Sequence, residues 1–251
     1  MLNVLIFVGG SIALTFVCYA LARRTLHKRS NEHTRDLSSS VVFRLSALHG
    51  LILALVFAQE LINYNALNRS INHESNLVES VYFDLRRFDA TQTAGLQKSL
   101  AEYVQVVLKE EWRLLASKRA LSDKAWDRRE VVLKGVLNLK TNGPSQTWLR
   151  ERMLQKLAAL EDERNSREIS ANTHMSPIFW FVALIGLALV SASFLSFQMN
   201  FANIALMAFF AIYTGIVLFF INAIDHPFEG PGRLSPVALE RLFEQFLRAH
   251  L

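Results

Sequence analysis

The sequence has few residues that cross-link or interrupt a chain, with one cysteine and five prolines among 251 residues. A single cysteine, Cys18, excludes an intramolecular disulfide and a zinc site made of cysteines. Three of the five prolines fall between 227 and 236, so that segment can be neither a helix nor a central strand. Alternation of apolar and polar residues, which marks a half-buried strand, does not extend over any useful length. The absence of a strand pattern favours an all-α fold.

Motifs of common enzymes are missing as well. There is no glycine-rich phosphate loop, no G-x-S-x-G and no H-E-x-x-H, and the seven histidines are scattered. The net charge of +5 forms no basic patch, because the 18 basic residues of 64–176 are interleaved with 15 acidic ones at helical spacing. We therefore expect neither an enzyme nor a nucleic-acid partner.

Charged residues are absent from three long apolar stretches, 2–22, 178–197 and 201–224. At about 1.5 Å per residue, each can cross roughly 30 Å of hydrocarbon. A further span is expected at about 41–62, where Arg44 and His49 shorten the apolar run. Since an arginine at the bilayer centre costs roughly 3 kcal/mol, we place Arg44 at the membrane edge. A buried or interfacial helix is the alternative for this segment.

A signal peptide is the alternative for the first stretch, because Ala20-Leu21-Ala22 has a small-x-small cleavage pattern. Signal peptides carry basic residues before their apolar region, whereas Arg23 and Arg24 follow it here. We therefore expect a span that the protein retains.

These stretches divide the chain into four parts. We predict an all-α membrane protein with four transmembrane helices in two hairpins, and a helical soluble insert between the second and third spans. The parts are a first hairpin at 1–63 (spans about 2–22 and 41–62), the insert at 64–176, a second hairpin at 177–224 (spans about 178–197 and 201–224), and a Pro/Gly-rich turn with a short amphipathic helix at 225–251.

Apolar residues of the insert recur at helical spacing in four runs. The first run can be continuous with the second span, and it has steps of three, four and seven: Leu67, Ile71, Val78, Val81, Leu85 and Phe88. The second carries Leu96, Leu100, Tyr103, Val104, Val107 and Leu114. The third follows a predicted N-cap at Ser122 and carries Trp126, Val132, Val136 and Leu139. The fourth follows a turn at 142–145 and carries Trp148, Met153, Leu157 and Leu160.

Polar residues on the second span are candidates for lining a pore: His49, Gln59, Glu60 and Asn63. A ring of such groups at the mouth of an oligomer would line an ion path. An ionisable residue deep in a membrane, such as His49, is a functional candidate by default, although an interhelical hydrogen bond would satisfy it equally well. An interfacial position without a transport role is the alternative for the other three.

The second run of the insert contains Glu110-Glu111-Trp112, two carboxylates beside an aromatic ring. These residues are candidates for a structural ion-pair anchor, with Arg86 or Arg87 of the preceding helix as partners. The alternative is a solvated pair of charges beside a Trp112 that packs in the core of the insert.

The segment after the last span, Asp225-His226-Pro227-Phe228-Glu229-Gly230, contains residues that shape a turn. Asp225 and Glu229 offer hard oxygen ligands of the kind that calcium prefers, so they are the metal candidates, and calcium is the one cofactor that the sequence suggests. In the alternative, Asp225 caps or salt-bridges the hairpin while Phe228 fills a hydrophobic pocket.

The order of these segments resembles the bestrophin-like domain family, membrane proteins of unassigned function. The resemblance covers nearly the whole chain: Tyr103 and then Glu111-Trp112 in the insert, Pro177 and Trp180 at the third span, and Asp225-His226-Pro227-Phe228-Glu229-Gly230 after the fourth.

Bestrophins proper are pentameric anion channels with an acidic calcium clasp after the fourth membrane segment, so the resemblance implies an oligomeric channel. The sequence departs from that pattern in three places. Glu229 stands between Phe228 and Gly230, Pro231-Gly232-Arg233 replaces the acidic run, and the second span lacks an aromatic-rich neck.

Charge and resemblance disagree about sidedness. The loop at 23–40 has five basic and two acidic residues, so the positive-inside rule places it in the cytoplasm and the insert on the other side. Bestrophin architecture implies the reverse. We expect a multi-pass protein of a bacterial inner membrane with an extracytoplasmic insert.

Two functions follow as hypotheses. The first is a bestrophin-like ion channel, a homo-oligomer in the lipid bilayer. The second is a membrane-anchored interaction or regulatory module without transport activity, whose helical insert binds a protein partner. A transporter is disfavoured, because four spans without an internal repeat leave little room for alternating access.

Overall fold

A computed structural model describes residues 2–26, 32–197 and 200–250, without the side chains of 26, 32–38 and 196. Within this part of the chain every regular element is a helix and none is a strand, as predicted. The chain divides into two compact units, Met1–Ile62 with Met175–Asp225 and Asn63–His174 with His226–Leu251.

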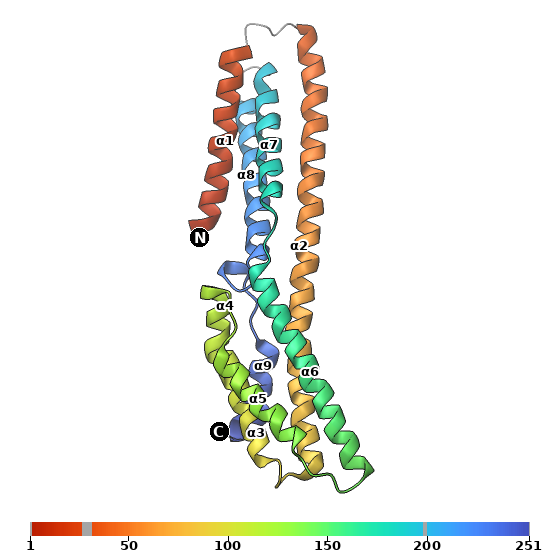
Figure 1. Cartoon of the computed structure of the whole chain (residues 1–251). Helices are drawn as coiled ribbons and strands as arrows, with labels where there is room; N and C mark the ends of the chain where they lie inside the picture. Colours follow the sequence, from red (N-terminus) through yellow and green to blue (C-terminus); the bar gives the residue numbers. More distant parts are fainter. Residues whose placement is uncertain (1, 27–31, 198–199, 251) are drawn as a thin grey trace. The chain divides into compact units, whose positions relative to one another are not determined.

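The first unit contains the most apolar helices. They are α1 (Leu2–Leu26), the N-terminal part of α2 (Glu32–Asp89), α7 (Pro177–Ser193) with the 3₁₀ turn Phe194–Ser196, and α8 (Phe201–Asp225). Helix α1 packs against both α7 and α8 (Figure 1). Residues 27–31 of the basic loop and 198–199 of the second hairpin turn lie outside the described residues.

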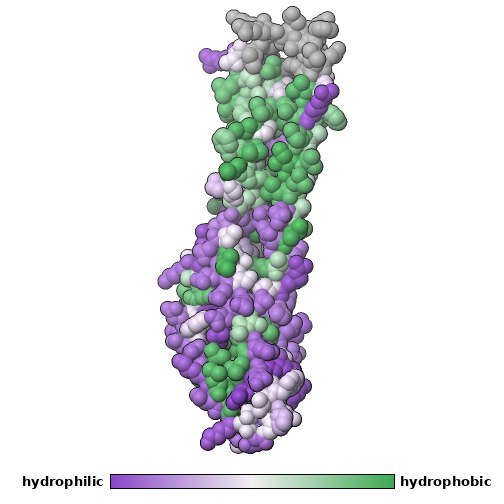
Figure 2. Space-filling view, turned by 45° about the vertical axis from the view of Figure 1, so that its right-hand side comes forward, coloured by the Kyte–Doolittle hydropathy of each residue, from purple (hydrophilic) through white to green (hydrophobic). Residues whose placement is uncertain are grey.

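Three of the described helices, α1, α2 and α8, are long and apolar enough to cross a membrane. Helix α7 has 17 residues and makes a fourth crossing only when it is counted with α6 (Pro144–Asn172), which precedes it. Helix α2 is longer than the predicted span, since its 58 residues run without a break. Hydrophobic residues cover the face of the first unit that Figure 2 shows, whereas hydrophilic ones predominate over the second.

Glycines bring the helices of the first unit close together. A Cβ on Gly215 of α8 would lie 2.7 Å from the Cα of Val8 on α1, and a Cβ on Gly186 of α7 would lie 2.3 Å from Nδ1 of His49 on α2. Such contacts leave no room for a side chain, so both glycines fix the distance between neighbouring helices.

The second unit begins with the C-terminal part of α2. It continues with α3 (Ala94–Val106), the π-helical turn η2 (Val107–Glu111), α4 (Trp112–Lys118), α5 (Asp123–Leu137) and α6, and after α8 it adds η4 (Gly230–Gly232), α9 (Val237–Leu242), η5 (Phe243–Leu247) and η6 (Arg248–His250). Ser122 caps α5 as predicted, because its hydroxyl accepts a hydrogen bond from the amide of Ala125 at 3.4 Å.

The core of the second unit follows the predicted stripes with two corrections. Leu115 is buried instead of Leu114, because the π-helical turn η2 adds one residue and shifts the stripe by one position. Trp126 and Trp148 belong to the predicted apolar runs, but 38% and 56% of their surfaces are exposed. The C-terminal helix completes this core with Leu239, Leu242 and Leu247.

Candidate functional site

His49 lies buried among the helices of the first unit. Its ring packs against Gly186 and is 6.2 Å from the ring of Phe210, measured between centroids. Its Nε2 has no hydrogen-bond partner in the part of the chain that the structure describes. The interhelical hydrogen bond considered from the sequence is therefore not made through Nε2.

The other three pore candidates lie further along α2. Gln59 is exposed and Glu60 half-buried in the first unit, and Asn63, the first residue of the second unit, is exposed. Polar groups at these positions are accessible to water or to another molecule, as a pore mouth requires. Their role in a pore stays a prediction.

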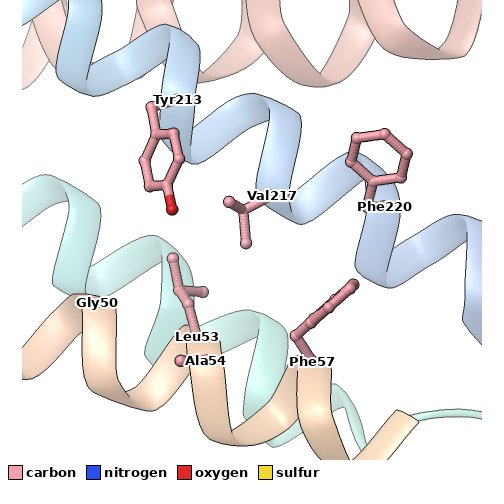
Figure 3. Close-up of a pocket in the computed structure, with 7 residues that line it drawn as sticks. All are labelled: Gly50, Leu53, Ala54, Phe57, Tyr213, Val217 and Phe220. Atoms are coloured by element: carbon pink, nitrogen blue, oxygen red, sulfur yellow. The ribbon is translucent and has the colours of Figure 1, made fainter. Parts of the chain in front are cut away.

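A pocket of about 260 Å³ opens between α2 and α8 in the first unit. Tyr213 and Val217 point from α8 toward Leu53 of α2, while Phe57 and Phe220 face each other at one end (Figure 3). The lining includes one polar side-chain group, the hydroxyl of Tyr213, and no charge. Such a pocket suits hydrocarbon and offers no path for an ion.

The second unit contains a buried ion cluster that consists of Glu74, Tyr103, Glu111, Arg164 and Arg167. Glu111 binds both arginines, with Oε2 at 2.6 Å from Nη2 of Arg164 and Oε1 at 2.6 Å from Nη2 of Arg167. Arg167 also lies 3.2 Å from Oε1 of Glu74, which accepts a hydrogen bond of 2.9 Å from the hydroxyl of Tyr103. At most 2% of any of these residues is exposed.

The same cluster also forms hydrogen bonds with the backbone of Ser122, the residue just before α5. The amide of Ser122 donates to Oε2 of Glu111 at 2.9 Å, and the carbonyl of Ser122 accepts from Arg164 at 2.6 Å. Four helical segments, α2, η2, α3 and α6, supply the charged and phenolic groups. These contacts link the four segments, and a change in their packing would leave buried charges without partners, which is costly.

Burial controls the protonation of the cluster. It raises the pKa of the Glu74 carboxyl above the ordinary value, because loss of hydration outweighs the attraction of Arg167 and the hydrogen bond from Tyr103. Burial, together with the charge of Glu74, raises the pKa of the Tyr103 phenol well above its ordinary value. For Arg167 burial acts against the charged form, but Glu74 and Glu111 more than offset it, so its pKa is raised.

Some polar atoms of the cluster have no partner within the described residues. They are Oε2 of Glu74 and the Nε and Nη1 atoms of Arg167. The guanidinium of Arg167 is however covered by the indole of Trp112, whose ring centre is 5.0 Å from its Cζ. The face of an aromatic ring attracts a cation and so stabilises a guanidinium whose hydrogen bonds are incomplete.

Glu111 forms buried ion pairs, but not with Arg86 or Arg87, the partners expected from the sequence. Arg87 instead lies 3.3 Å from Asp84, and Glu110 pairs with Lys124 at 3.0 Å near the surface. Arg86 is exposed, with its Cζ 5.9 Å from the ring centre of Tyr82. Arg86 and Arg87 lie on the exposed face of α2, so they do not reach the interior where Glu111 lies.

Three residues of the ion cluster, Glu74, Arg164 and Arg167, were not predicted from the sequence, and they occupy buried positions within regular apolar stripes. On α6 the buried positions are Met153, Leu157, Leu160, Arg164, Arg167 and Ala171, with steps of four and three throughout. Glu74 likewise fills the step of seven between Ile71 and Val78 on α2. A charged residue in phase with an apolar stripe was therefore the available signal.

Trp112 joins the ion cluster to the segment after α8. Its indole N–H donates to the carbonyl of Leu234 at 3.1 Å, and its ring meets Phe228 edge-on with centroids 5.9 Å apart. Phe228 is buried in a cluster with Leu67, Ile71, Leu115, Ala171 and Leu234. The turn before Leu234 uses Gly230 at φ 66°, a left-handed conformation that glycine adopts without strain.

Asp225 ends α8 and is buried, and its carboxylate accepts a hydrogen bond from the amide of Met175 at 2.7 Å. Pro227 is buried and its carbonyl accepts a hydrogen bond from the amide of Leu234 at 2.7 Å, while Glu229 is exposed. Calcium takes six to eight oxygen ligands, whereas one of the two candidate carboxylates already accepts the amide of Met175, just before α7. Calcium binding at Asp225 and Glu229 stays a prediction, and these donors support it poorly.

An all-helical fold with several apolar helices defines a helical membrane protein. The Bestrophin-like domain matches residues 9–239, so the chain belongs to the bestrophin-like domain family and the resemblance seen in the sequence is confirmed. A comparison with curated proteins finds no match.

Solved structures share the fold over the whole length of the chain. A membrane protein variant has a TM-score of 0.72 at 11% identity, covering 100% of this chain and 99% of its own. A variant of a bacterial bestrophin homologue from Klebsiella pneumoniae has a TM-score of 0.70 at 13% identity, with 98% and 99% covered. Another structure of a bestrophin homologue from that organism, phased with zinc, has a TM-score of 0.70 at 11% identity, with 98% and 97% covered. Identities this low show the fold alone.

Proposed function

We propose that several copies of this chain assemble into an ion channel whose pore is lined by α2. The observation that carries the proposal is the match of nearly the whole chain to the bestrophin-like domain and its fold. The resemblance to bestrophins, which are pentameric anion channels, supplies the expectation of conduction and of a homo-oligomer in the bilayer.

The first unit supports an oligomer for a second reason. Its pocket between α2 and α8 is apolar, and its one deeply placed ionisable residue on α2, His49, is covered by Gly186 and Phe210. Neither feature gives an ion a polar path within the described part of one chain, so we expect the path at a surface shared by several copies. Gln59, Glu60 and Asn63 are polar groups of α2 that are at least partly exposed, and such a path would use them. Four transmembrane spans, with α7 as the third, are part of this proposal.

The test is ion flux from liposomes that contain the purified full chain, with and without calcium, together with the particle's stoichiometry. We expect a closed ring of subunits and flux above that of empty liposomes. Glu60→Gln removes a negative charge at the expected pore mouth, so the permeability ratio of chloride to potassium should rise. Asp162→Asn, on the exposed surface of α6, is the matched control and should leave the ratio unchanged. Monomers without flux under both calcium conditions would refute the channel.

A further inference from the structure

A pocket of about 390 Å³ lies wholly within the second unit, beside the buried ion cluster. One wall comes from η2 and α4, and the other from the segment at 228–236 and from α9. Its volume falls in the range of about 300–1,000 Å³ that is usual for sites of small organic ligands. No step in the proposed conduction uses it.

The rim of this pocket carries uncompensated positive charge. Lys109, Arg113 and Arg233 line it, and Glu240 is the one acidic residue of the lining. In the part of the chain that the structure describes, none of the three cations forms an ion pair. The arginines of the buried cluster, by contrast, share two carboxylates. The rim therefore has a net charge of about +2 and attracts anions.

The inner wall of the pocket is apolar and held in place. Trp112 and Phe228 contribute to it and contact each other edge-on. Because the indole N–H of Trp112 is already bonded to Leu234, the ring presents apolar surface to the pocket. Ala116 lines the same wall, and its small side chain leaves space beside the rings.

We propose that this pocket binds a small amphipathic organic anion, a carboxylate or phosphate attached to an apolar body about the size of an aromatic ring. The apolar body packs against Trp112 and Phe228, and the acidic group lies between Arg113 and Arg233 at the rim. Guanidinium groups suit this task because their paired N–H donors match two oxygens of a carboxylate or phosphate. An apolar wall below a cationic rim selects a ligand that has both features and disfavours simple ions.

The test uses fluorine NMR with the full chain in nanodiscs of phosphatidylcholine and para-trifluoromethylbenzoate as the probe. We expect saturable broadening of the probe signal. Two matched compounds separate the contributions, since trifluoroacetate has the charge without the ring and para-trifluoromethylbenzyl alcohol has the ring without the charge. Both should bind at least about fivefold more weakly, because each loses one of the two kinds of contact. Equal binding of the alcohol would overturn the role of the rim, and equal binding of trifluoroacetate would overturn the role of the wall.

Variants assign the binding to this pocket. Arg113→Gln and Arg233→Gln should each weaken probe binding about fivefold, and Ala116→Phe, which fills the pocket, should abolish it. Arg69→Gln removes an exposed arginine on α2 outside the lining and should leave binding unchanged. The arginine variants change exposed side chains, so loss of fold does not explain an effect.

A last arm distinguishes a soluble anion from a lipid headgroup. The protein should bind the probe with the same affinity in nanodiscs that contain phosphatidylglycerol and in nanodiscs of phosphatidylcholine. Weaker probe binding in the presence of the anionic lipid would indicate that a lipid headgroup occupies the pocket, and it would overturn the assignment to a soluble anion. Identical probe binding by wild type and by the Arg113→Gln and Arg233→Gln variants would overturn the assignment as well.

Discussion

Glu111 holds the charge balance of the buried ion cluster, because one carboxylate serves both Arg164 and Arg167. Removing it leaves two buried guanidinium groups without their principal partner. Breaking a buried pair in this way costs about 3–5 kcal/mol. We therefore expect Glu111→Ala to lower the thermal unfolding temperature of the purified protein strongly or to prevent folding.

The neighbouring residue is the matched control. Glu110 is paired with Lys124, but 36% and 71% of their side chains are exposed. An exposed pair contributes at most about 1 kcal/mol, so Glu110→Ala should unfold close to wild type. If both alanine variants had the same unfolding temperature, the buried cluster would not stabilise the insert.

Glu74 gives the stability of the insert a dependence on pH. Burial raises the pKa of the Glu74 carboxyl in the folded state, so the folded protein binds this proton more tightly than the unfolded chain does. The resulting stabilisation is complete below the pKa of glutamate in the unfolded chain. It is lost as the pH rises through the pKa of Glu74 in the folded protein. Glu74→Gln keeps an oxygen acceptor for Tyr103 and cannot ionise. Between about pH 5 and about pH 8, wild type should therefore lose stability relative to Glu74→Gln.

This comparison requires unfolding midpoints of both proteins in the same detergent at each pH. Glu79→Gln, at a half-buried position one turn further along α2, controls for the loss of a carboxylate on the same helix. A wild type that gains stability over Glu74→Gln as pH rises would reverse the sign and show that the charged form of Glu74 is preferred in the fold.

Close contact between helices α1 and α8 depends on Gly215. A Cβ there would meet the backbone of α1, at 2.7 Å from the Cα of Val8 and 3.0 Å from the carbonyl oxygen of Phe7, so no side-chain rotation relieves the clash. Gly215→Ala should therefore separate the two helices, at a cost of about 1–3 kcal/mol. Gly10→Ala on α1 is the control, because a Cβ at Gly10 has nothing within 4 Å. Equal thermal stability of the two variants would show that α1 and α8 do not pack this closely.

The helices themselves could be predicted from the sequence, whereas their charged contacts could not. Apolar periodicity identifies the runs that form α2, α3, α5 and α6. A π-helical turn at η2 has no such pattern, so the stripe beyond it was placed one residue early. Arg164 and Arg167 lie in a polar stretch of the kind that is typical of a helix surface. Their common partner, Glu111, lies 53 residues before Arg164 and 56 residues before Arg167 in the sequence. Periodicity reports which face is buried, but it cannot pair charges from different helices.

The two units of the whole molecule draw on different sources of stability. Helices of the first unit expose large apolar side chains such as Leu55, Phe209 and Phe220, which a bilayer covers. The second unit has a hydrophobic core of its own and a surface rich in charge (Figure 2). The C-terminal helix belongs to this second core, so the insert at 64–176 taken alone lacks Leu239, Leu242 and Leu247 of its own packing. An interaction module would therefore need residues 226–251 as well.

Sidedness is the property of the whole molecule on which charge and family disagree. The buried pairing of Arg164 and Arg167 removes two cations from the surface of the insert, whereas Arg23, Arg24 and Arg44 are at least partly exposed around the first loop. On the positive-inside rule we predict that the loop is cytoplasmic and the insert lies on the other side of the membrane. In a Cys18→Ser background, Ser145→Cys on the insert should react with a membrane-impermeant maleimide in intact cells, and Ser40→Cys at the end of the loop should react only after lysis. Both positions are exposed, so access depends on the side of the membrane. The opposite pattern of labelling would give the chain the orientation of bestrophins, and the basic loop would then be a translocated exception to the charge rule.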